Sequence, residues 1–538
     1  MERDNRISMT ERKSPRTAAR ISVVVEVWAE QSPDHPALIE STGAWTYRQL
    51  AAAIADTQSW LRGLNVRAGD RVMIVGENCR AFVTVLLAAT GLDAWPVLVN
   101  ARLSGREIEQ IQEHSGARRV FYTVGVSSQA ADHAKQAGAT LEERDGVGPI
   151  GVGTMRDDVT PEPLDANVAD RVAALIYTSG TTGLPKGVML SHRNLLFMAE
   201  GSAKVRSVNP EDRVFGVLPM SHAVGLATVL LGSLTAGASV FLAPRFDPMT
   251  ARVTLEKEQI TLLYGTPAIF NQLLQYAKLR KLDSLKLLSL RIITSSGAPL
   301  DPVTKAGIEG LFGMVLHNGY GVTECSPTIA MTRPEAPRPD TSIGPPFPGI
   351  ELKFIGSDGQ PVEDGGIGEL HVRGPNVMKG YYRAPEETAA AIDSDGWFNT
   401  RDLARMENGN LSIVGRTKEL IVHSGFNVYP AEVEASLNSH PAVAQSAVVG
   451  RPLDGDEQVI AFVQLVPEAT LAPSDLAEYI QPRIAPYKRP TQIIFLSAMP
   501  TTATGKIAKA VLERLAASEE STQRISMVRR TSQEMPLA

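Results

Sequence analysis

The most informative segment of the chain is Tyr177-Thr178-Ser179-Gly180-Thr181-Thr182-Gly183-Leu184-Pro185-Lys186-Gly187. It follows an apolar run, Val172 to Ile176, that predicts a buried strand. Glycines let backbone N–H groups turn toward oxygen atoms, hydroxyl groups donate further hydrogen bonds, and lysine adds a positive charge. The segment therefore predicts a loop that wraps a polyphosphate at the end of a strand. The alternative is a surface turn rich in Gly, Ser and Thr.

The end of this segment separates it from a Walker A loop. That loop has glycine directly before its lysine and Ser or Thr directly after it. Here Pro185 precedes Lys186, and Gly187 follows it. The pattern therefore disfavours a P-loop kinase or GTPase.

The bulk composition is that of a soluble globular protein, with 43% apolar and 21% charged residues. A chain of 538 residues predicts more than one domain, and a net charge of −6 gives no electrostatic argument for binding nucleic acid. Cys79 and Cys325 are too few for a disulfide framework and fit a reducing compartment. No apolar run approaches the roughly 18 residues of a membrane span, and the N-terminus lacks the apolar core of a secretory signal. We therefore expect a cytoplasmic protein.

Strand and helix signals alternate before and after the glycine-rich segment. One such pair is the buried strand Arg71 to Gly76 followed by the helix Ala81 to Gly91. Alternation of this kind predicts an α/β fold of layered sheets. From Thr341 onward prolines and glycines become dense between short strands, which predicts a β-rich subdomain over residues 341–417.

The C-terminal part of the chain and its two ends differ in composition and in their pattern of predicted elements. Residues 418–515 alternate short strands with helices and predict a small α+β domain, so the large domain is expected over 21–417. Residues 1–20 are polar and rich in Arg, and we expect a disordered arm there, with a transit peptide as the alternative. Residues 516–538 are polar and charged and predict a flexible tail.

A second motif, Asn318-Gly319-Tyr320-Gly321-Val322-Thr323-Glu324, places a carboxylate directly after a hydroxyl and a glycine-flanked aromatic ring. A carboxylate beside a polyphosphate is a natural Mg²⁺ ligand, because Mg²⁺ prefers oxygen donors and takes few of them from protein. A third motif, Ser295-Ser296-Gly297-Ala298-Pro299-Leu300, follows a predicted strand. Open α/β sheets place ligands at such carboxyl ends.

Three further motifs lie toward the C-terminus. In Trp397 to Leu403 the carboxylate of Asp402 is suited to a vicinal diol, because it accepts two hydrogen bonds at once. Arg416 and Lys418 stand in a charged cluster that is otherwise typical of a solvated loop. The turn Pro500 to Lys506 is rich in hydroxyls and ends in a single lysine, a cation able to lower the barrier between two approaching anions.

In this order the motifs resemble those of the adenylate-forming (ANL) superfamily, and most of all its acyl-CoA synthetases of the fatty acyl-CoA ligase type. The matches span roughly residues 21–512. The resemblance implies a large N-terminal domain of layered α/β sheets plus a distorted β-barrel, followed by a small mobile α+β C-terminal domain with its hinge at Lys418. It also implies ATP, Mg²⁺ and CoA as cofactors. The positions that match cofactor-binding residues of the family are Thr178, Ser179, Gly180, Thr181, Thr182, Gly183, Lys186, Gly297, Ala298, Pro299, Asn318, Gly319, Tyr320, Gly321, Asp402, Arg416, Gly425 and Lys488.

The resemblance also implies the catalytic roles. Glu324 matches the magnesium ligand, Thr323 a contact to the α-phosphate, and Lys506 the lysine between the substrate carboxylate and that phosphate. His222 matches a position beside the acyl carboxylate. Asp402 matches the residue that holds the ribose hydroxyls, although Arg401 replaces the glycine that usually precedes it.

The implied reaction is formation of an acyl-adenylate from a carboxylic acid and ATP, followed by transfer of the acyl group to a thiol. The stretch Ser424 to Glu434 resembles the pantetheine tunnel of acyl-CoA synthetases, so CoA is the predicted acceptor. The alternatives are a ligase that loads a carrier-protein thiol, a luciferase-like oxidation, and a non-catalytic nucleotide-binding homologue. Acetylation of Lys506 is expected to silence adenylation, because it removes the required charge.

The substrate acid is specified less closely. No lysine or arginine stands out among the pocket candidates, which favours an apolar monocarboxylic acid: a medium- or long-chain fatty, alicyclic or aromatic acid. We expect a monomer or a homodimer that binds this acid, ATP and CoA. Ser296 replaces the usual Gly or Ala of the family. The residues predicted to line the substrate pocket are His222, Val224, Gly225, Thr266, Ser296 and Ile329.

Overall fold

The computed structural model describes residues 19–179, 185–285, 287–424, 426–453, 456–501 and 507–518. These residues form two compact units, which are treated separately below. The first unit comprises Met1–Leu300, Gly307–Leu352 and Val372–Phe398, and the second comprises Asp301–Ala306, Lys353–His371 and Asn399–Ala538. Residues 301–306, 353–371 and 399–417 thus fall in the second unit, whereas the sequence predicts them in the first domain. The predicted domain boundary stays a prediction.

Two eight-stranded sheets form the framework of the first unit. The central strands of both sheets run parallel, which requires helical crossovers between them, whereas the strands toward both ends of the second sheet pair antiparallel. The first sheet has the order β15 (Thr328–Met331), β14 (Leu316–Gly321), β13 (Ile292–Ser296), β12 (Leu262–Gly265), β10 (Arg213–Gly216), β11 (Ser239–Leu242), β1 (Pro36–Glu40), β2 (Gly43–Thr46). The second sheet has the order β18 (Gly380–Tyr381), β9 (Pro185–Ser191), β8 (Val172–Ser179), β4 (Trp95–Asn100), β3 (Arg71–Gly76), β5 (Ala117–Tyr122), β7 (Gly148–Val152), β6 (Thr140–Arg144).

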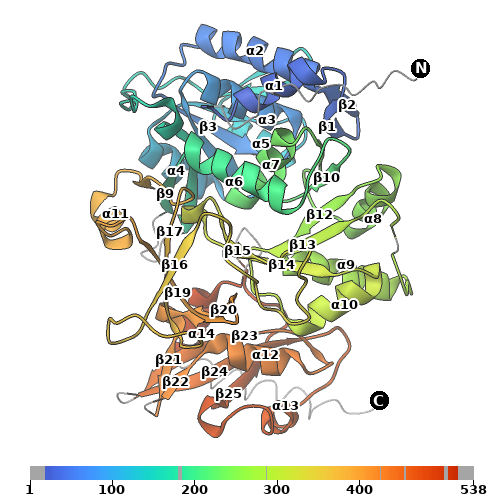
Figure 1. The fold of residues 1–538 in the computed structure, drawn as a ribbon, viewed down its shortest axis with the longest axis vertical. Coiled ribbons are helices and arrows are strands. Elements are labelled where there is room, and N and C mark those ends of the chain that lie inside the picture. The colour runs from blue at the N-terminus through green and yellow to red at the C-terminus, as the bar shows by residue number, and fades with distance from the viewer. Residues whose placement is uncertain are drawn as a thin grey trace, which may run out of the picture. The chain divides into compact units, whose positions relative to one another are not determined.

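Helices cover these sheets because the strands are apolar on both faces. Every residue of β3 is buried, as the sequence pattern predicts for a strand between two helical layers. Figure 1 shows α8, α9 and α10 beside β12, β13 and β14, and side chains from these elements form one apolar core around Phe270 and Ile293. The helices are α1 (Val23–Gln31), α2 (Tyr47–Gly63), α3 (Arg80–Gly91), α4 (Gly105–Ser115), α5 (Ser128–Gln136), α6 (His192–Val205), α7 (Gly232–Thr235), α8 (Pro248–Lys257), α9 (Pro267–Leu279), α10 (Pro302–Phe312) and α11 (Pro385–Ala391).

The second unit is α+β. A four-stranded sheet has the order β16 (Glu351–Ile355), β17 (Gly368–Arg373), β19 (Phe398–Glu407), β20 (Asn410–Arg416). The hairpin β21 (Ile421–His423) and β22 (Phe426–Val428) follows, and then a three-stranded sheet of β23 (Val443–Leu453), β24 (Asp456–Leu465) and β25 (Gln492–Phe495). Its helices are α12 (Pro430–Asn438), α13 (Pro473–Ile480) and α14 (Lys509–Ala517).

The predicted fold class is confirmed: a large α/β part with layered sheets precedes a smaller α+β part. The predicted strand Arg71 to Gly76 coincides with β3, and the predicted helix after it is α3. Among the helices that the structure describes, none is long and apolar enough to cross a membrane.

Candidate active site

Three parallel strands of the first sheet bring two of the sequence motifs together. In the β12–β13 and β13–β14 registers, Gly265 lies opposite Ser295, and Ser296 lies opposite Gly319. The residues that follow each strand therefore meet at one edge of the sheet, where open α/β sheets bind ligands. Gly297 turns away from β13 with φ of +87°, a conformation that glycine adopts without a steric penalty.

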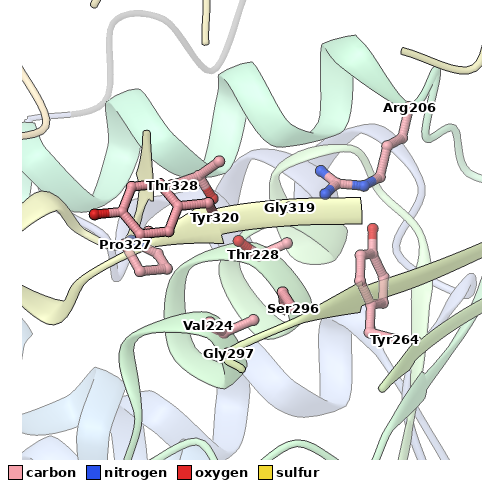
Figure 2. Close-up of a pocket in the computed structure, with 11 residues that line it drawn as sticks. Arg206, Val224, Thr228, Tyr264, Ser296, Gly297, Gly319, Tyr320, Pro327 and Thr328 are labelled. Atoms are coloured by element: carbon pink, nitrogen blue, oxygen red, sulfur yellow. The ribbon is translucent and has the colours of Figure 1, made fainter. Parts of the chain in front are cut away.

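A cavity opens at this edge (Figure 2). Of the residues singled out in the sequence, Val224, Ser296, Gly297, Gly319, Tyr320 and Gly321 line it. The lining residues that the sequence analysis missed are Arg206, Thr228, Tyr264, Pro327 and Thr328. Arg206 adds a cation to the lining, whereas no lysine or arginine stood out among the pocket candidates in the sequence.

One wall of the cavity is a π-helix, η3, over Val224–Leu231. Val224 and Thr228 line the cavity from this element. Short π-helical segments occur often at functional sites. The apolar run of eight residues predicts a buried element but not its hydrogen-bond register, so the sequence could not place Thr228 at the cavity.

The other predicted pocket residues lie outside the lining of this cavity, and their role stays a prediction. A Cβ on Gly225 would lie 2.1 Å from the carbonyl oxygen of Pro219, so close backbone packing accounts for this glycine. The hydroxyl of Thr266 caps α9, accepting a hydrogen bond from the backbone N–H of Ile269 at 3.4 Å. Ile329 is fully buried on β15, and His222 lies in the turn before the π-helix.

The glycine-rich segment begins and ends on strands. β8 continues to Ser179, beyond the predicted end at Ile176, and pairs antiparallel with β9, so that Thr178 lies opposite Lys186. The predicted phosphate loop is therefore shorter than the sequence suggested, because its two arms extend the second sheet. Gly180, Thr181, Thr182 and Gly183 lie outside the described residues.

Tyr381 links two predicted site residues of the first unit. Its hydroxyl donates a hydrogen bond to Oε1 of Glu324 at 2.9 Å, and the ammonium group of Lys186 lies 5.2 Å from the centre of its ring. Tyr381 reaches this position because β18 pairs with β9, with Tyr381 opposite Val188. No sequence motif singled out Tyr381, since only the pairing of distant strands brings it to Glu324.

The surroundings of Glu324 fit a magnesium site. Its carboxylate is partly exposed in the short 3-10 turn Thr323–Cys325, η4. Among the described residues, no group of three His, Cys, Asp or Glu side chains could hold a metal ion by itself. One carboxylate agrees with Mg²⁺, which takes one or two protein ligands and completes its shell with phosphate oxygens and water.

The remaining residues of the Asn318 to Glu324 motif are held firmly. The side-chain amide of Asn318 donates to the carbonyl of Thr341 at 2.8 Å, and its backbone N–H donates to the hydroxyl of Thr332 at 2.8 Å. A Cβ on Gly321 would lie 1.9 Å from the carbonyl oxygen of Pro327, so this position accepts only glycine without a backbone shift.

Ala298 and Pro299 follow Gly297 in the bend after β13.

In the second unit, Asp402 and Arg416 face each other across β19 and β20. Nε of Arg416 donates to Oδ1 of Asp402 at 2.9 Å, and Asp402 is only 3% exposed. The guanidinium thus holds the carboxylate in a fixed orientation. Lys418 is exposed on the short 3-10 turn η5 (Thr417–Glu419).

Arg401 replaces a glycine of the family motif at a position with left-handed backbone. Its φ is +58°, and its backbone N–H donates to Oδ1 of Asn399 at 2.8 Å. A residue with a Cβ costs about 1–2 kcal/mol more than glycine in this backbone conformation. Part of that difference is offset, because glycine loses more conformational entropy on folding. We expect Arg401→Gly to stabilise the β19–β20 hairpin by about 0.5–1 kcal/mol. The measurement is slower amide hydrogen exchange of β19 and β20 in the intact protein.

The control for this prediction is Arg401→Ala, which removes the side chain but keeps a Cβ at the same φ. Its exchange rates in β19 and β20 should match those of the unmodified chain. Equal slowing in both variants would show that the arginine side chain, rather than the backbone conformation, carries the cost.

The predicted CoA contacts lie in the second unit or outside the described residues. The ammonium of Lys488 contacts both carboxylate oxygens of Glu432, at 2.6 and 2.7 Å. Beside it, the rings of Tyr487 and Phe426 stack with centroids 4.6 Å apart. Gly425 and the predicted catalytic Lys506 lie outside the described residues. The roles of these residues stay predictions.

Comparison with known proteins identifies the family. Residues 25–382 match the model of the AMP-binding enzyme family, and residues 432–506 match that of the AMP-binding enzyme C-terminal domain. The chain belongs to the AMP-binding enzymes. Its relatives include feruloyl-CoA synthase from Amycolatopsis sp., 34% identical over 490 residues that cover 90% of this chain and 97% of the relative.

Two further matches bear on the reaction. The 3-[(3aS,4S,7aS)-7a-methyl-1,5-dioxo-octahydro-1H-inden-4-yl]propanoyl:CoA ligase of Mycobacterium tuberculosis is 34% identical over 506 residues, covering 90% of this AMP-binding enzyme and 96% of the relative. The crystal structure of ATP-bound MatB from Rhodopseudomonas palustris superposes with a TM-score of 0.81 and 28% identity, covering 92% and 98% of the two chains. The predicted class is confirmed: this AMP-binding enzyme is an AMP-forming acyl-CoA ligase that uses ATP, Mg²⁺ and CoA.

Proposed function

We propose that this ligase joins CoA to a monocarboxylic or related acid with an apolar, ring-containing body, through an acyl-adenylate. The observation that carries the proposal is the cavity at the ends of β12, β13 and β14. Val224, Pro327 and three glycines provide apolar surface in its lining, among the polar side chains of Arg206, Thr228, Tyr264, Ser296, Tyr320 and Thr328, so an apolar body can lie between a few polar groups. The two curated relatives described above are named for ring-containing acids, which supports an alicyclic or aromatic substrate over a long fatty acid.

The proposed chemistry depends on bringing two anions together, the substrate carboxylate and the α-phosphate. Glu324 would hold Mg²⁺, which would supply positive charge at the phosphates. Lys186 and Thr178, which pair across β8 and β9, are the proposed contacts to phosphate oxygens, and Thr323 is the proposed contact to the α-phosphate. Lys506 is the proposed cation between the two anions, with His222 beside the carboxylate. Positioning and charge neutralisation then account for catalysis without a covalent protein intermediate.

Asp402 is the proposed ligand of the ribose hydroxyls, and Arg416 fixes its carboxylate. We further propose that acetylation of Lys506 stops adenylation, because the side chain loses its charge. These roles rest on the family motifs together with the contacts described above.

The test is a screen of carboxylic acids with the whole enzyme. ATP–pyrophosphate exchange and CoA-thioester formation are measured for fatty, alicyclic and aromatic acids. We expect acid-dependent exchange and a matching CoA thioester, both highest for ring-containing acids. Exchange without any thioester would favour a ligase for a carrier-protein thiol, and no exchange with any acid would favour a non-catalytic homologue. A preference for long-chain acids would contradict the proposed substrate class.

A further inference from the structure

Arg206 is a buried cation at the cavity. It follows the last residue of α6 and is only 4% exposed. Its side chain lines the cavity (Figure 2). Nη1 donates to the hydroxyl of Ser202 at 2.7 Å. Nε is buried and has no hydrogen-bond partner. A buried charge without compensation is costly, so this guanidinium calls for an acceptor.

No protein carboxylate supplies that acceptor within the part of the chain that the structure describes: no acidic side chain lies within 4.0 Å of Arg206 there. Its other close neighbour is aromatic, since the guanidinium carbon lies 5.2 Å from the ring centre of Tyr264. Burial lowers the pKa of Arg333, a second partly buried arginine; Glu335 raises it, and Arg206 lowers it by a smaller amount.

Two hydroxyl groups accompany Arg206 in the lining of the cavity. Tyr264, at the end of β12, is 3% exposed, and Figure 2 shows its hydroxyl directed toward the Arg206 side. The hydroxyl of Thr228, on the π-helix, is buried and has no hydrogen-bond partner. Arg206, Tyr264 and Thr228 thus present polar groups to a cavity whose lining also includes Val224, Pro327, three glycines and the hydroxyl side chains of Ser296, Tyr320 and Thr328.

Arg206 and Tyr264 lie away from the end at which we propose that adenylation takes place. In Figure 2, Tyr320 and Pro327 lie at one end of the cavity, and Arg206 and Tyr264 lie at the other. From Tyr320 the chain leads through Gly321 to Thr323 and Glu324, the proposed phosphate and magnesium contacts. An acid with its reacting carboxylate toward Glu324 would therefore extend its far end toward Arg206.

We propose that Arg206, with Tyr264 and Thr228, forms a subsite for an oxygen acceptor carried by the substrate at the end remote from the carboxylate that is adenylated. The acceptor is a carboxylate or a ketone oxygen. This inference rests on the proposed function, because it assumes that the acid occupies this cavity. It narrows the substrate from an apolar acid to an acid with an apolar middle and an oxygenated far end.

A purely structural role explains only part of what Arg206 does. A cation at a helix C-terminus is favourable, and the bond to Ser202 fits that role. Arg280 has the same place at the end of α9. Its guanidinium carbon lies 5.8 Å from the centre of the Tyr276 ring, yet Arg280 is exposed. Capping a helix therefore does not require burial of the arginine in a cavity. Arg280 also provides a matched control.

The experiment compares kcat/KM for acids that share one body and differ only at the far end. One series is 3-(4-methylcyclohexyl)propanoate, its 4-oxo analogue and its 4-carboxy analogue, and another is octanoate, 7-oxooctanoate and octanedioate. We expect the unmodified enzyme to prefer at least one oxygenated acid over its alkyl partner by about a hundredfold, in line with a buried charged hydrogen bond. Arg206→Met should abolish that ratio, mainly through KM, while Arg280→Met keeps it.

The conservative variants identify the acceptor. If Arg206→Lys keeps the preference that Arg206→Met loses, the acceptor is anionic; if both lose it, a neutral carbonyl needs the guanidinium fork. Tyr264→Phe should weaken the same ratio by about tenfold. A preference for the alkyl acids in the unmodified enzyme, which needs no variant to fold, would overturn the inference. So would an unchanged ratio in Arg206→Met. Absence of pyrophosphate exchange with every acid would instead refute the proposed function.

Discussion

Glu324→Gln should lower acid-dependent ATP–pyrophosphate exchange by about a hundredfold to a thousandfold. The substitution keeps the size and polarity of the side chain but removes the negative charge proposed to hold Mg²⁺. Loss of one electrostatic contact to the reacting charges typically costs a factor of this size. Because the defect lies in metal binding, high Mg²⁺ should restore part of the rate. The measurement is exchange over a range of Mg²⁺ concentrations.

Tyr381→Phe tests the contact that orients this carboxylate. The ring beside Lys186 remains, but the 2.9 Å hydrogen bond to Glu324 is lost. Loss of a residue that orients a metal ligand typically costs 10- to 100-fold, so we expect a smaller defect than in Glu324→Gln. Glu351→Gln, which alters an exposed carboxylate paired with Arg373, is the control and should exchange at the normal rate. Exchange by Glu324→Gln within threefold of normal at every Mg²⁺ concentration would contradict the assignment.

Lys509→Met should destabilise the second unit by about 3 kcal/mol. Nζ of Lys509 lies 2.8 Å from a carboxylate oxygen of Glu419 and 2.9 Å from one of Glu434, and the three side chains are only 18–21% exposed. Removing the lysine leaves two partly buried carboxylates without their cation, a change that typically costs several kcal/mol. Amide exchange in α14 should become about a hundredfold faster, measured by mass spectrometry on the whole enzyme at pH 8.

The effect of Lys509 should depend on pH in a defined direction. Burial lowers the pKa of Lys509, but the carboxylates of Glu434 and Glu419 outweigh burial, and the net pKa is raised above the ordinary value of 10.5. A raised lysine pKa stabilises the fold fully below that value, and the stabilisation is lost as pH rises through the higher folded value. The difference in calorimetric midpoint between Lys509→Met and the unmodified enzyme should therefore narrow only above about pH 10.5.

Lys488→Met is the control for this prediction, because Glu432, its partner, is 43% exposed and solvent screens such pairs. Its effect on α14 should stay below about 1 kcal/mol. Equal effects of the two substitutions would contradict the special role of Lys509. Lys509 begins α14, and Glu419 belongs to the turn that holds Lys418, so the triad fixes this helix to the predicted hinge segment.

The family, the enzyme class and the cofactors followed from the sequence because the motifs are local. In the segment from Asn318 to Glu324, turn, hydroxyl and carboxylate are contiguous, so their order along the chain already fixes how they can surround a ligand. The same holds for the strand at Arg71 to Gly76, whose unbroken apolar run requires burial on both faces. The strand before the phosphate loop was predicted too short, because pairing between β8 and β9 extends it to Ser179.

The tertiary structure alone decided which side chains share the cavity. Arg206, Thr228 and Tyr264 come from the end of α6, a π-helix and β12, and no spacing along the sequence relates them. Tyr381 likewise reaches Glu324 only through the pairing of β18 with β9. The sequence by itself determined the chemistry of phosphates and thioesters. Burial, in contrast, is a property of the folded chain. Only the fold removed the Arg206 guanidinium from water, and the free-energy cost of that uncompensated charge points to an oxygenated substrate.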